Sequence, residues 1–282
     1  MIKVTRQLVQ KCFHKRPINS NKFENGRVLV VGGNEDYVGA PVLAALSAKA
    51  ALRTGAGISY LAAPEKVGFA ASAYSPDLIV YKLKGTHFSK KHLKSVLEYS
   101  KKVDVVVIGN GLGLHKDTVS FVKEFVKKVS VPLVIDADGI KAVKGMIFDK
   151  PVLLTPHARE FEIFCGKKLV DPKMHVKEVA KKHNCVILLK GKTDYISGGE
   201  KVYSSQTGNS GMAVAGTGDV LAGVCAAFVS HKNSLIHSAC SGAFVCGLVG
   251  DRLLKKKGVG FIASDFVDEI LFVTKSFWSK AK

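Results

Sequence analysis

The sequence predicts an α/β fold of three layers, with helices on both faces of a mostly parallel central sheet. Short runs of Val, Ile and Leu recur along the chain, and they are continuous, as in strands buried on both faces. Segments of helical length and composition separate these runs. No linker, repeat or low-complexity block interrupts the pattern. Residues 1–282 are therefore expected to form a single domain.

The apolar runs give the predicted strands, which are residues 27–31, 58–62, 77–81, 104–108, 133–136, 152–154 and 186–189. The predicted crossover helices include residues 40–54, 115–129 and 172–183. Residues 194–198 and 201–204, joined by Gly199 and Glu200, are typical of a hairpin at one edge of the sheet. Two apolar helices near 218–230 and 234–254 are expected to close the core, and an amphipathic helix follows Ser264 and Asp265.

The charge is strongly basic but evenly spread. Lys and Arg number 42 against 23 Asp and Glu, which gives a formal net charge of +19. Only 6 of the basic residues are Arg, the side chain that typically binds phosphates and DNA bases with two parallel hydrogen bonds. The other 36 are Lys, which occur in scattered pairs with no aromatic residues between them. This pattern favours solvated helix faces over a nucleic-acid surface. A basic surface can still attract an anionic small molecule.

The six cysteines show no CxxC pair and no metal-ligand spacing, and most lie in apolar runs. They are expected to be reduced core residues. Residues 1–10 lack the apolar region of a secretory signal, and the apolar stretch 235–250 is interrupted by His237, serines and glycines. A cytoplasmic protein without a membrane span is expected.

Ligands of such sheets bind beyond the carboxyl ends of the strands, so the segments that follow the strands are the informative ones. Gly32 and Gly33 fit either a tight turn or a close approach to a ligand. Residues 109–113 are glycine-rich, but Leu114 and Lys116 stand where a dinucleotide-fold fingerprint needs its third glycine. Residues 190–193 are not a Walker A loop, because Val186 stands where its first glycine belongs.

The strongest motif is Gly216-Thr217-Gly218-Asp219 at the start of an apolar helix. Free backbone N–H groups and the positive end of the helix dipole would form an anion hole there for a transferring phosphoryl group. Asp219 could cap the helix, or it could be a base that takes a proton from an attacking hydroxyl. Its position directly after the glycines favours the catalytic interpretation.

These four residues resemble the terminal signature of ribokinase-like small-molecule kinases. Other segments narrow the resemblance to the ADP- or ATP-dependent NAD(P)H-hydrate dehydratases and follow that family's order from about residue 14 to 225. They are residues 32–40, 51–57, 109–113, 132–139, 155–161 and 189–194. The combination of Thr155-Pro156-His157 with Glu160-Phe161 and the segment 215–221 is specific; either part alone would indicate only a ribokinase-like protein.

The resemblance implies repair of NADH or NADPH that has taken up water at the nicotinamide C5–C6 bond. In that family the catalytic Asp, here Asp219, deprotonates the C6 hydroxyl of the S epimer, the nucleotide phosphorylates it, and phosphate leaves. Residues 216–218 would be the anion hole. By position, the substrate contacts would be Ala40, Gly113, His157 and Asp219, and the contacts of ADP or ATP would be Lys190, Gly191, Lys192, Thr193, Asp194 and Gly218.

Mg²⁺ is expected as well, carried on the phosphates, and no protein metal ligands are assigned. Asp136 and Asp138 could help to position it or could cap the turn at Gly139. A lone His is more often structural, but the position of His157 after a strand favours binding. Asn110 stands where the family more often has proline, and this departure is expected to loosen the loop before Gly113.

Several alternatives stay open. The donor can be ADP or ATP, and the substrate hydrated NADH or hydrated NADPH; a homo-oligomer is expected, without the epimerase domain often fused to this family. One rival function is a vitamin-precursor kinase of the same fold, acting on a hydroxymethylpyrimidine or a hydroxyethylthiazole. Another is a basic nucleic-acid-binding protein that keeps the fold without catalysis; the scattered lysines and the intact Gly-Thr-Gly-Asp motif argue against it.

Overall fold

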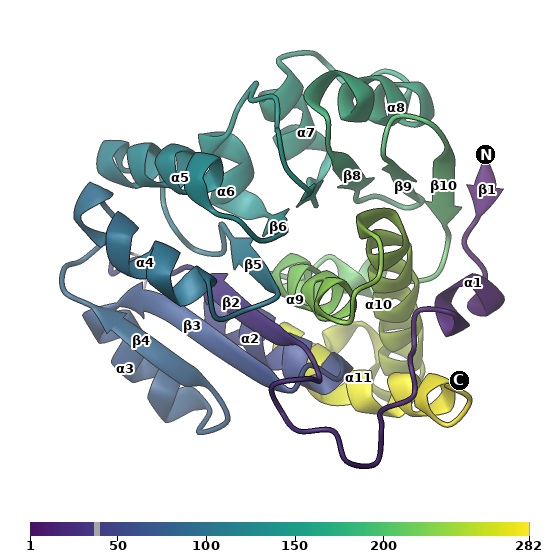
Figure 1. Cartoon of the computed structure of the whole chain (residues 1–282). Coiled ribbons are helices and arrows are strands. Elements are labelled where there is room, and N and C mark those ends of the chain that lie inside the picture. The colour runs from purple at the N-terminus through teal and green to yellow at the C-terminus, as the bar shows by residue number, and fades with distance from the viewer. Residues whose placement is uncertain (37–39, 282) are drawn as a thin grey trace.

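A single twisted sheet runs through the computed structural model (Figure 1), which describes residues 1–36 and 40–281 and, for residues 40–42, the backbone only. The ten strands of this described part are β1 (Ile2–Lys3), β2 (Arg27–Val31), β3 (Ile58–Pro64), β4 (Ile79–Leu83), β5 (Val105–Ile108), β6 (Leu133–Ile135), β7 (Val152–Leu154), β8 (Val186–Leu189), β9 (Asp194–Ser197) and β10 (Val202–Ser205).

The strand order is β1-β10-β9-β8-β7-β6-β5-β2-β3-β4. From β8 through β4 every neighbouring pair is parallel. Only β9 opposes its neighbours among the described strands, because it pairs antiparallel with both β8 and β10, whereas β1 pairs parallel with β10. The carboxyl ends of β2, β5, β6, β7 and β8 therefore lie side by side at one edge of the sheet.

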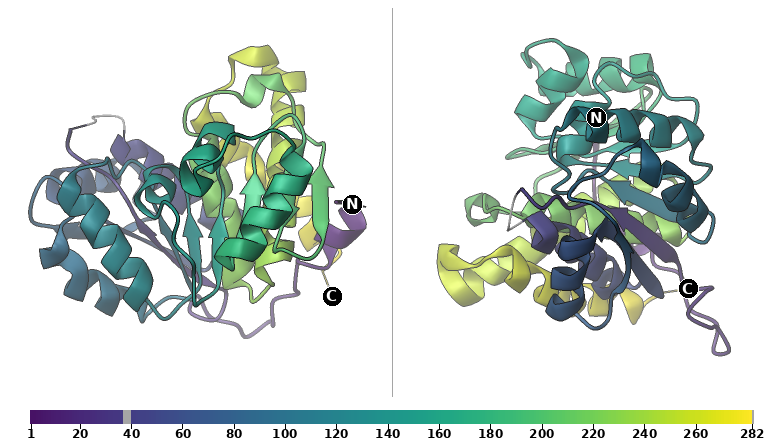
Figure 2. Two further views of the ribbon diagram at one scale, coloured as in Figure 1. Left: turned by 90° about the horizontal axis from the view of Figure 1, so that it is seen from above. Right: turned by 90° about the vertical axis from the view of Figure 1, so that its left-hand side faces the viewer.

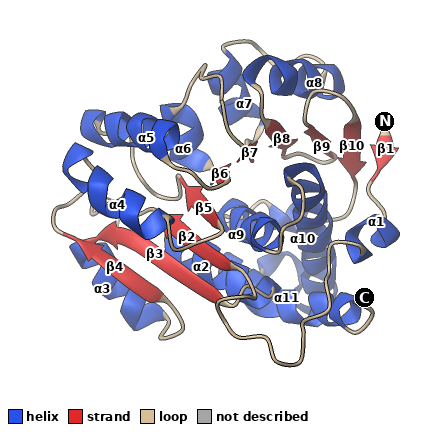
Figure 3. Ribbon diagram, viewed as in Figure 1, coloured by secondary structure: helices blue, strands red, loops and turns tan. Residues whose placement is uncertain are grey.

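Helices cover both faces of the sheet (Figures 2 and 3). One face packs against α1 (Arg6–Gln10), α2 (Ala40–Thr54), α3 (Glu65–Tyr74), α9 (Thr217–Ser230), α10 (Leu235–Lys257) and α11 (Ala263–Trp278). The other packs against α4 (Leu93–Ser100), α5 (Lys116–Lys128), α6 (Ala137–Ala142), α7 (Ala158–Cys165) and α8 (Pro172–His183). Three short 3₁₀ turns are η1 (Lys90–His92), η2 (Ser210–Met212) and η3 (Gly258–Gly260). The two apolar clusters confirm the predicted three-layer architecture.

The helix α9 lies at the centre of its layer, and this placement fixes the position of Asp219. Twelve of its residues, from Asp219 to Ser230, are buried. A side chain at Gly223 would put its Cβ 2.0 Å from the Ser47 carbonyl oxygen, so only glycine lets α9 approach α2 this closely. Burial of a nearly all-apolar helix between the sheet and α2, α10 and α11 holds its first turn rigidly at the ligand edge.

The predicted elements agree with the structure apart from their ends and the edge of the sheet. The hairpin β9–β10 forms, but it is not the edge, because β1 pairs beyond β10. The short, exposed segment Ile2–Lys3 carries no apolar run from which a strand could be predicted. The last helix begins at Ala263, before Ser264 and Asp265, whose carboxylate accepts the Ile262 N–H at 3.0 Å.

The cysteines behave as the sequence predicts. All six are free, and five of them are buried; Cys165 is partly exposed. Burial raises the pKa of the Cys185 and Cys240 thiols to about 12, so they are inert, packed groups. None of the helices in the described part of the chain is long and apolar enough to cross a membrane.

Candidate active site

Polar side chains meet where four neighbouring strands end and helix α9 begins. Asn110 follows β5, Asp136 follows β6, Thr155 follows β7 and Lys190 follows β8, while Asp219 comes from the first turn of α9. The sequence between these residues is a series of crossover units, so only the parallel sheet brings them to the same edge. This is the edge at which open α/β sheets bind ligands.

Asp219 is the most perturbed carboxyl group at this edge. Its residue is 9% exposed. Burial, together with the nearby negative charge of Asp136, raises its pKa to about 7, while hydrogen bonding to Asn110 and the charge of Lys190 act in the opposite direction. A carboxyl group that titrates near neutrality is a good general base, because it is both ionised and basic enough to accept a proton.

Asn110 is the direct partner of this carboxylate. Its Nδ2 donates a hydrogen bond of 2.6 Å to Asp219 Oδ1, and the residue is fully buried. Its Oδ1 is buried too and finds no hydrogen-bond partner within the described ranges. Sequence reasoning missed this role. The signal that could have found it is a polar residue directly after a buried strand.

Three hydrogen bonds hold the loop that contains Asn110, and the expected effect of its departure from proline stays a prediction. The Asn110 carbonyl oxygen accepts the Gly33 N–H at 2.9 Å. Asn34 Nδ2 donates to the Leu112 carbonyl oxygen at 3.2 Å. The Gly113 N–H donates to Asp138 Oδ2 at 2.9 Å. Asparagine at this position also contributes a side-chain contact to Asp219, which proline could not make.

Lys190 lies between two buried carboxylates. Its Nζ is 3.0 Å from Asp136 Oδ1 and 3.9 Å from Glu160 Oε2. Burial alone would lower its pKa, but Asp136, Glu160 and Asp219 together raise the Lys190 pKa above its ordinary value. Thr155 Oγ1 donates to the same Asp136 oxygen at 2.8 Å. The ammonium group is thus permanently charged and held in place.

The glycines before Asp219 leave room for a ligand next to this ammonium group. A Cβ added at Gly218 would meet Lys190 Nζ at 3.2 Å and Asp136 Oδ2 at 3.9 Å. Gly216 is the N-cap of α9 with a φ of 93°, a left-handed conformation that provides no capping side chain. In the described residues the N–H groups of Gly216 and Gly218 have no acceptor. They and the helix dipole can bind an anion.

Thr217 differs from the other members of the expected anion hole. Its N–H donates to the Val214 carbonyl oxygen at 3.3 Å, and its hydroxyl is 2.9 Å from the carbonyl oxygens of Met212 and Val214. Its N–H is therefore occupied. Of the three residues expected to form the anion hole, Gly216 and Gly218 therefore offer a free N–H within the described part of the chain and Thr217 does not, because its hydrogen bond closes the turn before α9.

The turn from β8 to β9 carries the residues expected to bind the nucleotide. Gly191 and Lys192 are exposed at its tip, and Thr193 and Asp194 are partly exposed. The Gly191 N–H donates to Asp194 Oδ1 at 3.0 Å, which closes the turn. Burial raises the Asp194 pKa to about 6. Only Lys190 of these five residues contacts the Asp136 and Glu160 carboxylates directly.

His157 lies near Lys190, because both side chains contact Glu160. It caps α7 with its ring Nδ1, which accepts the Glu160 N–H at 3.3 Å, and its Nε2 is 3.4 Å from Glu160 Oε1. Its side chain is 53% exposed. It therefore has a structural role and still presents its ring at the ligand edge.

The structure gives less support to the other two expected substrate contacts, Gly113 and Ala40. The Gly113 N–H is occupied by Asp138, whose other oxygen accepts Lys141 Nζ at 2.8 Å, so Asp138 is a structural residue. Ala40 begins α2, and its side chain lies outside the described part of the chain.

A hollow elsewhere in the molecule does not compete with this site. It has a volume of about 430 Å³ and lies at the opposite end of the sheet, where Arg27 begins β2. Two of its cationic side chains are paired with one carboxylate, since Asp104 is 3.1 Å from Arg27 and 2.8 Å from Lys232. Burial lowers the pKa of His231 to about 4, which keeps this ring neutral. Its lining residues include Arg27, which begins β2, and Asp104, which directly precedes β5, so the hollow lies at the amino ends of these strands.

Comparison with known proteins agrees with this geometry. A family model described as NAD(P)H-hydrate dehydratase matches residues 28–271. The bifunctional NAD(P)H-hydrate repair enzyme Nnr of Pyrobaculum aerophilum is 39% identical over 268 residues, which are 93% of this chain and 53% of that protein. The ADP-dependent (S)-NAD(P)H-hydrate dehydratase of Nitrosopumilus maritimus is 36% identical over 282 residues, 97% of each chain. This chain thus spans about half the length of the bifunctional relatives that it matches.

Solved structures show the same fold. The ADP/ATP-dependent NAD(P)H-hydrate dehydratase of Bacillus subtilis, co-crystallised with ATP/Mg²⁺, superposes with a TM-score of 0.84 at 23% identity, over 98% of both chains. This likeness confirms the ribokinase-like architecture that the sequence predicts. From the extent of the family match and the identity with a relative of equal length, the chain belongs to the NAD(P)H-hydrate dehydratase family.

Proposed function

We propose that this protein dehydrates the S epimer of hydrated NADH or NADPH, with ADP or ATP as the phosphoryl donor. The observation that carries the proposal is the position of Asp219, a buried carboxyl group with a pKa near neutrality at the N-terminus of α9. Family membership supports the same reaction. The vitamin-precursor kinase is not favoured, because the matching family model and relatives are dehydratases.

The first step is a proton transfer to Asp219. Its free carboxylate oxygen takes the proton of the substrate's C6 hydroxyl, while Asn110 holds the other oxygen at 2.6 Å. The alkoxide then attacks the terminal phosphorus of the nucleotide, so that a new O–P bond forms as the bond to the leaving AMP or ADP breaks. The N–H groups of Gly216 and Gly218 and the dipole of α9 would stabilise the charge on the transferring group.

Elimination completes the reaction. Phosphate is a much better leaving group than hydroxide, and it departs with the C6–O electron pair as the ring nitrogen lone pair forms a C=N bond. Loss of a proton from C5 then restores the dihydropyridine. The protein needs only to phosphorylate the alcohol, because the phosphorylated product breaks down by its own chemistry.

Lys190 is the proposed nucleotide contact with the clearest physical basis. A phosphate seated against the open Cα of Gly218 would lie beside its ammonium group, whose orientation is fixed by Asp136 and Glu160. We assign residues 191–194 to the nucleotide and Ala40, Gly113 and His157 to the hydrated dinucleotide, by their position in the family pattern. The exposed ring of His157 supports its assignment.

The donor set fits Mg²⁺ bound mainly through phosphates. Asp136 Oδ1 is used by Thr155 and Lys190, whereas its Oδ2 takes part in no hydrogen bond within the described residues and faces Gly218. A free carboxylate oxygen is a ligand that Mg²⁺ prefers. Asp136 would hold the ion, which would neutralise charge on the phosphates. A homo-oligomeric state and a cytoplasmic location stay predictions.

An absorbance assay tests the proposed function. Hydrated NADH, prepared as a mixture of epimers, is incubated with the protein, Mg²⁺ and either ADP or ATP. Return of the near-ultraviolet band of reduced nicotinamide supports the reaction, and the faster nucleotide identifies the donor. Failure of both nucleotides, with folded protein and with a hydroxymethylpyrimidine or hydroxyethylthiazole phosphorylated instead, would replace the dehydratase by the kinase.

A further inference from the structure

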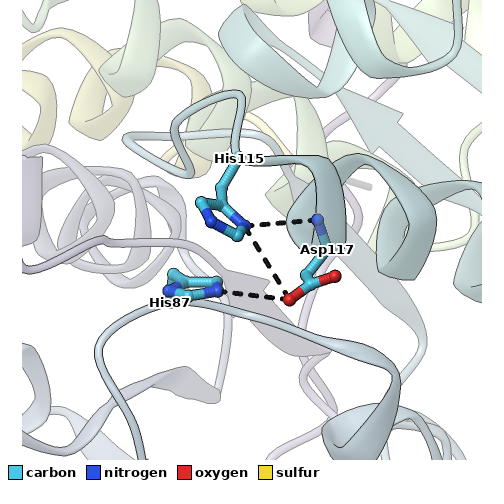
Figure 4. Close-up of side chains that lie close together, drawn as sticks. All are labelled: His87, His115 and Asp117. Carbon is cyan, nitrogen blue, oxygen red and sulfur yellow. Dashed lines mark hydrogen bonds and ion pairs between the residues drawn. The ribbon is translucent and has the colours of Figure 1, made fainter.

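Two histidines and an aspartate gather on the surface beyond β4 and β5 (Figure 4). His87 belongs to the segment between β4 and η1, whereas His115 is the N-cap of α5 and Asp117 lies in its first turn. Asp117 Oδ2 is 3.8 Å from His87 Nε2 and 3.9 Å from His115 Nδ1. One ligand atom of each residue lies within 4.8 Å of the others. The sequence gives no hint of this cluster, because the two histidines are far apart in the chain.

The hydrogen bonds direct ring lone pairs into the space between the three side chains. His87 Nδ1 is 3.0 Å from Thr86 Oγ1, and a proton on Nδ1 that bonds Thr86 leaves the lone pair of Nε2 facing Asp117. His115 Nδ1 accepts the Asp117 N–H at 3.3 Å, so its lone pair lies on the Asp117 side of the ring and would have to give up this long bond to bind a metal. Metal-binding histidines characteristically donate their second ring N–H to a neighbour, as Thr86 allows here.

We propose that His87, His115 and Asp117 form a binding site for Zn²⁺. Two imidazoles and one carboxylate are a ligand set that zinc favours, whereas Mg²⁺ and Ca²⁺ prefer oxygen alone. Zinc–ligand bonds of about 2.0–2.1 Å need each imidazole nitrogen to approach the Asp117 oxygen by roughly half an ångström from 3.8 and 3.9 Å, and the two imidazoles to close on each other as well. The side chains have room to do so, because His115 and Asp117 are 51% and 64% exposed. Water would occupy the fourth position.

Zinc would replace weak contacts rather than strong ones. The His115 capping bond is long at 3.3 Å, and the His–Asp pairs are beyond hydrogen-bond distance. The ion would link the β4–η1 segment to the β5–α5 loop. Thr86 also accepts the Glu35 N–H at 3.0 Å through its carbonyl oxygen, and Gly113 precedes His115 by two residues. The bound metal would therefore brace two segments close to the candidate active site without taking part in phosphoryl transfer.

Metal titration of the intact chain tests this proposal. Protein stripped with a chelator is titrated with Co²⁺, followed by its visible absorption, and with Zn²⁺, followed by calorimetry. We expect one ion per chain, the intense visible bands of a low-coordinate cobalt site, and displacement of Co²⁺ by Zn²⁺. Affinity should fall at acidic pH, because protons compete for the imidazoles.

Two variants and a control locate the ion. His87→Gln should abolish binding, and Thr86→Val should weaken it about 10-fold to 100-fold, since it removes only the partner of His87 Nδ1. His14→Gln, which changes an exposed histidine on another part of the surface, should bind as the wild type does. Circular dichroism checks the fold of each. No saturable binding by the wild type, or unchanged binding by His87→Gln, would overturn the proposal.

Discussion

Asn110 Nδ2 donates a 2.6 Å hydrogen bond to Asp219 Oδ1, in a position where neither group reaches solvent freely. The amide can donate to the carboxylate but cannot donate to a protonated oxygen equally well, so it favours the ionised form of the base. It also fixes which carboxylate oxygen is free to take a proton. This pair connects the loop after β5 with the first turn of α9.

Asp219→Asn should reduce kcat by roughly 10²–10⁴-fold, the range for loss of a general base. Nucleotide affinity should change little, because the Gly216 and Gly218 N–H groups and Lys190 remain. Steady-state rates and equilibrium binding of ADP and ATP measure the two effects. A wild-type rate in this variant would exclude Asp219 as the base.

The pH dependence of kcat/KM should report the titration of Asp219. The Asp219 pKa is raised to about 7, and only the ionised carboxylate can accept a proton. Activity should therefore increase tenfold per pH unit below about pH 7 and level off above it. A flat profile between pH 5 and 8 would contradict the assignment.

The raised pKa of Asp219 also makes the stability of the protein depend on pH. Activity increases with pH, whereas stability decreases. The native pKa lies above that of an unfolded aspartate, so the folded state binds more protons between about pH 4 and 7 and loses stability as pH rises through this window. Asp219→Asn removes this loss. Its Tm should exceed that of the wild type by several degrees at pH 8 and match it near pH 4. Calorimetry at both pH values is the check, and equal Tm values at pH 8 would refute the buried charge.

Asn110→Ala should shift the rising limb of the pH profile upward. Hydrogen bonding to Asn110 lowers the Asp219 pKa against the effect of burial, so its loss moves the titration to higher pH. A merely structural role would lower activity equally at all pH values. Asn19→Ala, at an exposed position, is the matched control and should keep the wild-type profile.

Lys190→Met should both weaken nucleotide binding and destabilise the fold. Without the ammonium group, Asp136 and Glu160 become buried carboxylates without a cation, which costs roughly 3 kcal/mol. The double variant Lys190→Met/Asp136→Asn should recover part of the free energy of unfolding, but not the affinity for nucleotide. Lys192→Met, at the exposed tip of the same turn, should be as stable as the wild type. Additive effects of the two substitutions in chemical denaturation would contradict the pairing.

The variants Gly218→Ala and Gly216→Ala distinguish two roles of glycine. One role is to leave space for a ligand, and the other is to adopt a backbone conformation that other residues rarely adopt. Alanine at Gly218 would put its methyl group 3.2 Å from Lys190 Nζ, where the phosphate is expected, so the KM for nucleotide should rise while Tm stays close to wild type. At Gly216, with a φ of 93°, the methyl group would meet Ala263 Cβ at 2.8 Å, so Tm should fall. Equal effects of both substitutions on Tm would argue against the assigned role of Gly218.

The sequence predicts the layers of the fold well, because strands buried on both faces need continuous apolar runs. Residues 152–154 and 186–189 coincide with β7 and β8, and Pro172 begins α8 as predicted. The edge strand β1 escapes prediction, because a pair of exposed residues gains its partner only in three dimensions.

The site is predictable where a local motif carries it and not where the fold assembles it. Gly218 and Asp219 share one helix turn, so the sequence alone predicts that they lie close to each other. Lys190 meets Asp136 only because β8 and β6 flank β7 in the sheet. Likewise, the contact between Asn110 and Asp219 depends on how α9 packs against the end of β5, and no spacing in the sequence reveals it.

The most direct test of the central claim compares wild type with Asp219→Asn on the S epimer of hydrated NADH in the presence of Mg²⁺ and ADP or ATP. We expect the wild type to restore the reduced-nicotinamide absorbance and to release one phosphate for each dinucleotide repaired. Asp219→Asn should bind the nucleotide and do neither at a comparable rate. Recovery of absorbance without phosphate release, or equal rates for the two proteins, would contradict phosphoryl transfer with Asp219 as its base.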